Sequence, residues 1–530
     1  MPRYKPTERN GLLLPVILAE QIQPGSFEFA LDHLVEHELE LSDLDARFDN
    51  DETGASAYDP RVMLKIVLLA YSRGLVSSRR IAHACEYNIQ FIALSGDARP
   101  SYTHIAKFVR ELGPQIGELF TQVLITCDRM HLIGRHMFAI DGVKLPANAS
   151  KERSGTHDEL RHRAARLDKA ARKIIELHQS QDASGAQGEL DAGRQARIEA
   201  LRREAKRTRE FVATSAKRRG RKGKELKSNI TDPDSAKMAT SKGVIQGYAA
   251  QAAVDSAHQI IVAADVIGSG SEQAMLMPMV QRCEPYRANH TLITADAGYH
   301  SEDNIAALKE QAIPAMVADN QMRQRDERLE GQAKHKAKKD PLYDKQPTGQ
   351  HKPIRLFKPG DFRFIDEHTA ICPAGKMLTS NGSIYTLGRG YRMQRYEASE
   401  SDCKGCRLRG QCIKTPERTA ARTVSRFHAT SKARDDPSEL MRRAIDSPRG
   451  RQLYSQRIAT VEPVFANIRH NKRLNRFTLR GRDKVNTQWH LYSLVHWCTT
   501  SRSWRKRDTP AEGRQQAQNP HQRAGWSGGP

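Results

Sequence analysis

Two short apolar stretches of the chain each end in an aspartate that a glycine closely follows. Residues 136–140 lead into Asp141-Gly, and residues 291–295 lead into Asp296-Ala-Gly. A short continuous apolar run predicts a buried strand of the kind found in helix-covered sheets. Ligands of open α/β sheets bind at the carboxyl ends of strands, so we expect the two acids to meet at one site. The chain is therefore predicted to have an α/β core.

A third acid, Glu462, lies on the edge of a predicted amphipathic helix. The apolar positions of this helix are spaced at i, i+3, i+4 and i+7, namely Val461, Val464, Phe465 and Ile468. Each acid alone also has a structural interpretation, because Asp-Gly is common in turns and a helical Glu is usually solvated. Together, three carboxylates favour Mg²⁺ or Mn²⁺ over zinc. Two such ions about 3.5–4 Å apart catalyse phosphoryl displacement, which is the chemistry of nucleases and strand transfer.

The charge and the cysteine content favour a nucleic-acid partner inside the cell. A net charge of +23 and a pI near 9.7 attract polyanions, although basic tails contribute to both values. The chain begins with no charged-then-apolar signal, and no stretch approaches a membrane-spanning length. We expect a cytoplasmic protein in contact with the bacterial chromosome, whose eight cysteines are thiols or metal ligands rather than disulfides.

Five segments together resemble an insertion-sequence transposase of the DDE, RNase H-like superfamily, close to the group named after insertion sequence eleven-eighty-two. They are residues 141–150, 229–235, 246–254, 295–301 and 454–469, and the likeness runs from about residue 58 to residue 497. The resemblance implies that Asp141, Asp296 and Glu462 are the catalytic residues and hold two Mg²⁺ or Mn²⁺ ions. It also implies that the partners are the terminal inverted repeats of the element and a target DNA, with a homodimer in synapsis.

The third segment of this family carries DNA-contact residues, for which Tyr454, Arg457 and Arg469 are the counterparts here. The related signature is Tyr-x2-Arg-x3-Glu-x6-Lys, whereas this chain has four residues between Arg457 and Glu462 and an arginine at the last position. In an uninterrupted helix Arg457 would point away from Glu462. Pro463 follows at once, and a proline kinks a helix where a bulge can absorb an extra residue.

The chain is too long for one ordinary core and is predicted to divide into several parts. A helical domain that binds the DNA ends is expected over 1–130 and the first part of an RNase H-like mixed sheet over 131–318, with a helical insertion at 151–219. A β-rich insertion is expected at 319–445, the final helix of the core at 446–500 and a basic disordered tail at 501–530. Within the core, residues 243–255 and 259–267 are predicted to form an antiparallel hairpin.

Four cysteines of the β-rich insertion form a candidate zinc site. Cys403 and Cys406 have Cys-x2-Cys spacing, and Cys372 and Cys412 flank them. Four thiolates suffice for a closed tetrahedral site. Unligated thiols are the alternative, because Cys372 is far from the pair in sequence.

The sequence leaves two other functions open. One is a nuclease of the same fold that cuts DNA without joining it, and the other is a DNA-binding regulator without enzymatic activity. A zinc-dependent hydrolase is excluded because the chain has no His-Glu-x-x-His or comparable ligand set. We favour a transposase that binds the ends of its own element, cuts there and transfers the strands.

Overall fold

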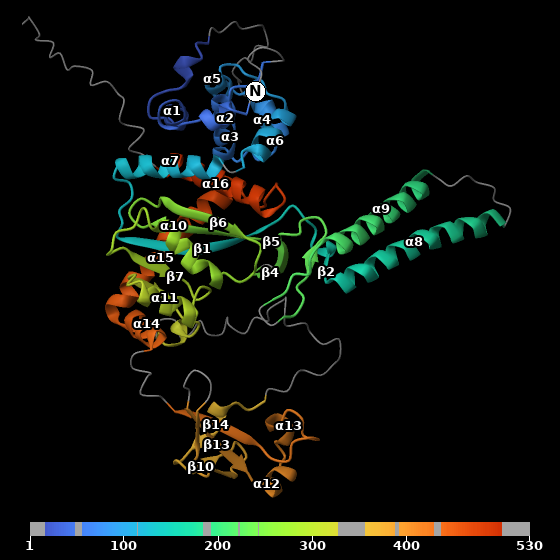
Figure 1. Ribbon diagram of the computed structural model, residues 1–530, viewed down its shortest axis with the longest axis vertical. Helices are drawn as coiled ribbons and strands as arrows, with labels where there is room; N and C mark the ends of the chain where they lie inside the picture. The colour runs from blue at the N-terminus through green and yellow to red at the C-terminus, as the bar shows by residue number, and fades with distance from the viewer. Residues whose placement is uncertain are drawn as a thin grey trace, which may run out of the picture. The chain divides into compact units, whose positions relative to one another are not determined.

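The computed structural model divides the chain into two compact units. The described residues are 16–47, 56–113, 115–183, 192–220, 223–241, 243–326, 356–386, 392–428 and 436–500. The first unit comprises Met1–Asn320 and Pro448–Pro530, and the second comprises Gln321–Ser447. The tail predicted at 501–530 lies outside the described residues. The second unit is thus inserted between two parts of the first (Figure 1).

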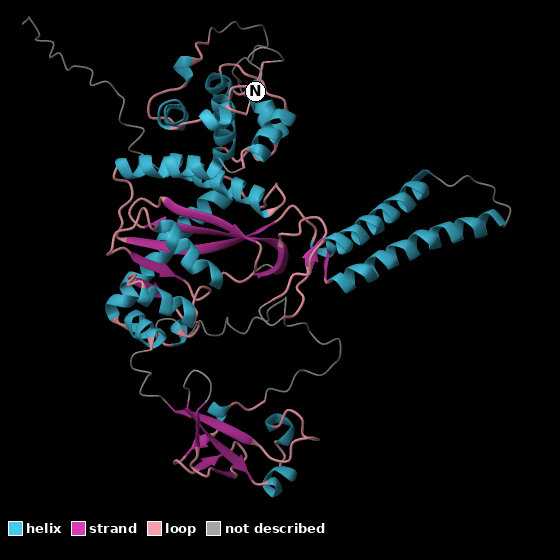
Figure 2. Cartoon of the chain, viewed as in Figure 1, coloured by secondary structure: helices cyan, strands magenta, loops and turns pink. Residues whose placement is uncertain are grey.

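A mixed six-stranded sheet forms the centre of the first unit (Figure 2). Its strands are β1 (Met137–Pro146), β4 (Ala236–Thr240), β5 (Gly243–Asp255), β6 (Ile261–Ile267), β7 (Leu292–Ala295) and β8 (Ala315–Val317). The order is β4-β5-β1-β7-β8, and β6 also pairs with β5. The pairs β1–β7 and β7–β8 are parallel, whereas β5 is antiparallel to all its neighbours. The prediction of an α/β core is confirmed, as is the antiparallel hairpin, which forms between β5 and β6.

Two helices from the end of the chain pack on this sheet. Helix α15 (Pro448–Ala466) contacts β1, β5 and β7, and α16 (Arg482–Thr500) contacts β6. The indole nitrogen of the fully buried Trp489 donates a hydrogen bond of 2.9 Å to the carbonyl oxygen of Gln251 in β5. Because this bond satisfies the indole inside an apolar layer, it fixes α16 against the sheet.

The N-terminal part of the first unit is helical. Its helices are α1 (Phe27–His33), α2 (Ser42–Asp45), α3 (Pro60–Ser72), α4 (Ser78–Tyr87), α5 (Ile89–Ser95), α6 (Tyr102–Glu111) and α7 (Gln115–Arg129). Helix α3 is buried along most of its length and packs on α16, where the rings of Tyr71 and Tyr492 stack with centroids 4.7 Å apart. Helix α16 therefore contacts both the sheet and the N-terminal helices.

A long helical hairpin is inserted between β1 and β4. Helices α8 (His157–Ala183) and α9 (Ala192–Thr214) lie side by side and extend away from the sheet (Figure 1). A two-stranded pair, β2 (Ser154–Gly155) with β3 (Ser228–Asn229), closes the base of the insertion. The side chain of Asn229 strengthens this closure by donating hydrogen bonds of 2.8 Å to the Ser150 carbonyl and the Ser154 hydroxyl oxygen.

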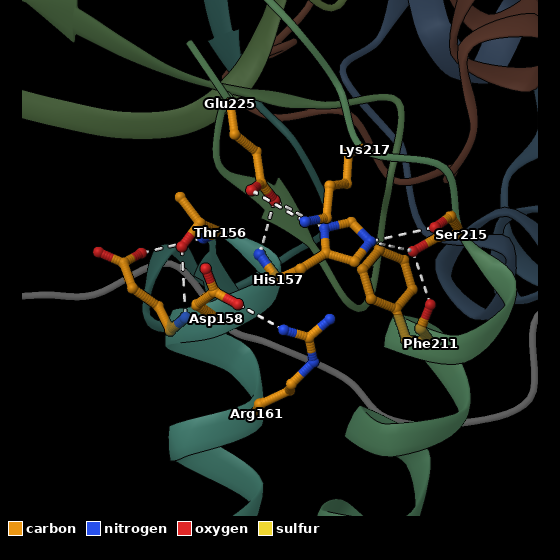
Figure 3. Close-up of polar contacts among 9 residues, drawn as sticks. Thr156, His157, Asp158, Arg161, Phe211, Ser215, Lys217 and Glu225 are labelled. Atoms are coloured by element: carbon orange, nitrogen blue, oxygen red, sulfur yellow. Dashed lines mark hydrogen bonds and ion pairs between the residues drawn. The ribbon is translucent and has the colours of Figure 1, made fainter.

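The buried side chain of His157 fixes the base of the hairpin (Figure 3). Its Nδ1 lies 2.7 Å from a carboxylate oxygen of Glu225, and its Nε2 lies 3.0 Å from the carbonyl oxygen of Ser215. The backbone N–H of His157 also donates to Glu225 at 2.7 Å. One residue thus connects the start of α8 with the segment that follows α9.

The second unit contains a smaller antiparallel sheet. Its strands are β9 (Arg363–Phe364), β10 (Thr369–Ile371), β11 (Met377–Thr379), β12 (Ile384–Thr386), β13 (Arg392–Ala398) and β14 (Thr423–His428). The second unit also contains three short helices, α12 (Glu400–Lys404), α13 (Arg409–Cys412) and α14 (Pro437–Asp446). Its core is small and consists of Phe362, Ala370, Leu378, Tyr396 and Val424.

Among the described residues, none of the helices has the length and apolar character needed to cross a bilayer.

Replacing His157 with Ala tests the base of the hairpin. The change leaves the half-buried Ser215 carbonyl and Glu225 carboxylate with fewer partners, so we expect the free energy of unfolding to fall by about 1–3 kcal/mol. Denaturant unfolding measures this difference. The matched control is His162→Ala on the exposed face of α8, which should change stability by about 0.5 kcal/mol or less. Equal effects of the two substitutions would contradict the assignment.

Candidate active site

The register of β1 against β7 places Asp141 and Asp296 next to each other. The parallel pairing ends at Ile140 opposite Ala295, and each aspartate is the next residue of its strand or loop. Beyond this point β1 continues to Pro146, because β5 still pairs with it on the other side. The expectation that the strand ends at Asp141 is therefore wrong. The parallel pairing with β7, however, ends one residue before Asp141.

Each aspartate is held by the backbone that follows it. One carboxylate oxygen of Asp141 accepts a hydrogen bond of 2.7 Å from the N–H of Gly142. One oxygen of Asp296 accepts a bond of 2.8 Å from the N–H of Gly298. These contacts fix the first side-chain torsions and leave the second oxygen of each group for other partners.

Arg457 contacts the remaining oxygen of Asp141. The two side chains are 2.6 Å apart and largely buried, with 11% and 20% of their surface exposed. The guanidinium also lies 5.7 Å from the ring centroid of Tyr454, whose hydroxyl donates to the carbonyl oxygen of Ala295 at 3.3 Å. Tyr454 and Arg457 therefore face the aspartates from α15, and Arg469, further along, is half-buried.

Glu462 lies on the other face of α15. It is exposed and borders a shallow groove with Ser455, Ile458, Ala459, Pro463 and Ala466. Helix α15 passes through Pro463 without interruption, and a π-helical turn follows only at Asn467–Asn471. No extra residue is absorbed between Arg457 and Glu462. Helical spacing of five residues therefore turns the two side chains apart, and the structure does not bring Glu462 to the aspartates.

A different acid, Glu272, lies beside the two aspartates. It precedes the short helix Gln273–Met275, which leads into α10 (Leu276–Cys283). A glutamate just before a helix is common and does not by itself indicate a functional site. Its one sequence signal is its position directly after the β5–β6 hairpin. No spacing relative to either aspartate could have identified it.

Burial and mutual repulsion perturb the acids of this cluster. Burial raises the pKa of Glu272 to about 7; the nearby Lys144 opposes this shift, and Asp296 and Asp141 add to it. Burial also raises the pKa of Asp141, against the effect of Arg457. Three carboxylates thus share the site with two cationic side chains, an arrangement typical of functional sites.

In the second unit, the four predicted zinc ligands line one cavity of about 30 Å³. The backbone N–H of Lys376 donates to the sulfur of Cys372 at 3.3 Å, and that of Arg422 donates to Cys403 at 3.5 Å. Burial raises the pKa of Cys412, Arg422 lowers it, and the other three cysteines raise it further. The fold therefore brings together four cysteines that are up to forty residues apart in sequence.

Neither cluster forms a finished metal site. Among the residues that the structure describes, no group of three or more His, Cys, Asp or Glu side chains is arranged to hold a metal ion. In the carboxylate cluster, Arg457 occupies the oxygen of Asp141 that a cation would need.

Two segments match transposase families. Residues 371–497 match a family described as Transposase DDE domain, and residues 16–111 match one described as Transposase domain (DUF772). No curated protein matches the chain. The first match includes the four cysteines and α15 and the second lies in the N-terminal helices, while Asp141 and Asp296 lie outside both. Together the matches support an insertion-sequence transposase.

The raised pKa of Glu272 predicts a pH-dependent stability. The pKa of Glu272 is about 7 in the folded protein and 4.5 in the free group, so the folded protein favours the protonated side chain. The contribution of Glu272 to the free energy of unfolding is therefore complete below pH 4.5 and is lost as the pH rises through 7. Relative to Glu272→Gln, the wild type should therefore lose on the order of 2 kcal/mol of unfolding free energy between pH 4.5 and pH 8. Denaturant unfolding across this range measures the difference. A pH-independent difference would contradict the assignment; Glu284→Gln, an exposed acid after α10, is the control.

Proposed function

We propose that this protein is a DDE transposase that binds the ends of its insertion sequence, cleaves the DNA there and joins the 3′-hydroxyls to target DNA. The observation that carries the proposal is the register of β1 and β7, which places Asp141 beside Asp296. Two acids delivered from adjacent strands are suited to metal-dependent phosphoryl transfer. The transposase-family matches at both ends of the chain support the same function.

The arrangement of the first unit supports an RNase H-like core. Along the chain, β1 is followed by the β5–β6 hairpin, α10, β7, α11 (Glu302–Glu310) and β8. This is the order expected from the family resemblance, with α15 returning to the sheet after the second unit. The helical hairpin and the second unit are both inserted between elements of this core, so neither interrupts a strand.

The charges of the site fit one or more divalent cations. Asp141, Asp296 and Glu272 supply three carboxylates, whereas Arg457 and Lys144 supply two positive charges. Carboxylate oxygens are the preferred ligands of Mg²⁺ and Mn²⁺. A cation at Asp141 would replace Arg457, which here compensates the charge of that carboxylate. We propose Mg²⁺ or Mn²⁺ as the cofactor, held by the two aspartates and a further acid.

Different residues of the chain would hold the metal ions and contact the DNA during the reaction. Bound divalent ions supply a Lewis acid that activates the attacking water or 3′-hydroxyl and stabilises the leaving oxygen. Asp141 and Asp296 would hold the ions in fixed positions because their own backbone already orients them. Arg457, once it leaves Asp141, is placed to contact the scissile phosphate, and Tyr454 orients Arg457 through its ring.

Exposed basic residues on two helical regions are suited to DNA binding. Helices α4 and α6 contact each other and expose Arg79, Arg80, Lys107 and Arg110. The hairpin of α8 and α9 has a hollow bordered by five basic residues, Arg161, Lys169, Arg172, Lys173 and Arg209. Contacts of this kind bind phosphates and position a duplex without reading its sequence. We propose that the N-terminal helices recognise the transposon ends and that a homodimer brings two ends together.

Replacing Asp296 with Asn tests the proposal. The amide keeps the size of the side chain but removes a metal-binding charge, so Mg²⁺-dependent cleavage and strand transfer should fall by about three orders of magnitude or more. Binding of labelled transposon ends should stay near the wild-type value. The substrate is a duplex bearing the inverted repeats that flank the gene, and gel analysis separates nicked from joined products.

The matched control is Asp303→Asn, an exposed acid on α11, which should retain both activities. Cleavage by the purified Asp296→Asn protein would refute the assignment. Cleavage without joined products in the wild type would favour the nuclease. End binding with neither product would favour the regulator.

We further propose that Cys372, Cys403, Cys406 and Cys412 hold a structural zinc ion in the second unit. All four thiols line one cavity, and two of them accept backbone N–H bonds, as ligands in closed zinc sites do. The hydrophobic cluster of its small sheet contains five buried residues among those that the structure describes. A bound metal would therefore stabilise a fold that has little apolar burial of its own.

Zinc content tests this assignment. The full-length protein should carry one zinc ion per chain by elemental analysis, and Cys406→Ala should lose it because three thiolates leave the site open. Cys85→Ala, in the N-terminal helices, should keep the ion. A zinc-free wild type whose four thiols react freely with a thiol reagent would show that the cysteines are unligated.

A further inference from the structure

The carboxylate of Glu272 lies against the two glycines that follow the aspartates. A methyl group added at Gly142 would come within 2.8 Å of one carboxylate oxygen of Glu272. A methyl group at Gly298 would come within 3.4 Å of the other oxygen, and within 2.9 Å of the carboxylate of Asp296. The two oxygens of Glu272 thus face the Asp141 segment and the Asp296 segment at the same time.

Hydrogen bonds hold the Glu272 segment at this place. The side chain of the next residue, Gln273, donates a bond of 2.7 Å to the carbonyl oxygen of His300 in the loop after Asp296. The side chain of Asn304 donates to the carbonyl oxygens of Gln273 and Tyr299, at 2.7 and 2.8 Å. These bonds connect the short helix before α10 to the Asp296 loop, so Glu272 and Asp296 are positioned together.

We propose that Glu272 is a third carboxylate ligand of the divalent metal site, in the role that the family resemblance assigns to Glu462. This inference rests on the proposed function. The cluster has an excess of negative charge at the point where Glu272 bridges the two aspartate segments, and a divalent cation would compensate it. Glu462 is exposed on the opposite face of α15 and offers no such contact.

The position of Glu272 gives a physical reason for the glycines at positions 142 and 298. A side chain at position 142 would force the carboxylate of Glu272 and the side-chain amide of Gln251 to shift. The glycines after the two aspartates therefore do more than allow a turn. They leave room for a third acid beside the aspartates. A methyl group at Gly142 should displace the Glu272 carboxylate and weaken the metal site without removing any charge.

Mn²⁺ binding to the full-length protein without DNA tests the proposal. Titration calorimetry, with electron paramagnetic resonance of free Mn²⁺, gives the affinity independently of catalysis. Glu272→Gln should lower the affinity for Mn²⁺ at least about tenfold, and Gly142→Ala should lower it in the same direction. Asp296→Asn is the positive reference, and Glu284→Gln is the matched control on the same segment. Thermal unfolding without metal verifies that each variant folds.

The outcome for Glu462→Gln decides between the two acids. If Glu272 is the ligand, Glu462→Gln should bind Mn²⁺ within about twofold of the wild type, because no charge is removed from the cluster. Unchanged affinity in Glu272→Gln, combined with loss in Asp296→Asn, would overturn the role of Glu272 and leave the proposed function intact. A wild-type protein that binds no Mn²⁺ would overturn both.

Discussion

The parallel pairing of β1 with β7 brings two negative charges together inside a sheet, and the surroundings of that pair compensate them. Backbone N–H groups satisfy one oxygen of each aspartate, and Arg457 pairs with a second oxygen of Asp141. Like charges in a buried place are costly unless counter-charges or a cation offset them. The position of α15 therefore contributes to the electrostatics of the site as well as to the covering of the sheet.

The proximity of the two aspartates was predictable because each follows a short apolar run, and acids at the ends of neighbouring parallel strands lie at the same edge of a sheet. It was harder to predict which side chains of α15 face the aspartates, because one extra residue in a helix rotates a side chain by about 100°. Arg457 and Tyr454 turn toward the aspartates, while Glu462 turns outward. The assignment of Tyr454, Arg457 and Arg469 as DNA contacts stays a prediction, and so does the catalytic assignment of Glu462.

Glu272 could not be identified from the sequence for a different reason. Its position depends on long-range hydrogen bonds from Gln273 and Asn304, and no local pattern encodes these. The four cysteines are an intermediate case. The Cys-x2-Cys pair was visible in the sequence, but only the folding of the second unit brings Cys372 and Cys412 into the same cavity. Local motifs thus indicated single members of each cluster better than the complete cluster.

The ion pair between Asp141 and Arg457 joins residues separated by 316 positions in the chain. A ribosome adding about 5–20 residues per second needs roughly 15–60 s to make that much protein. Asp296 is made about halfway through this interval, so both aspartates are present without the arginine only during its second half. The ion pair that compensates Asp141 can therefore form only late in synthesis, after both aspartates are already part of the chain.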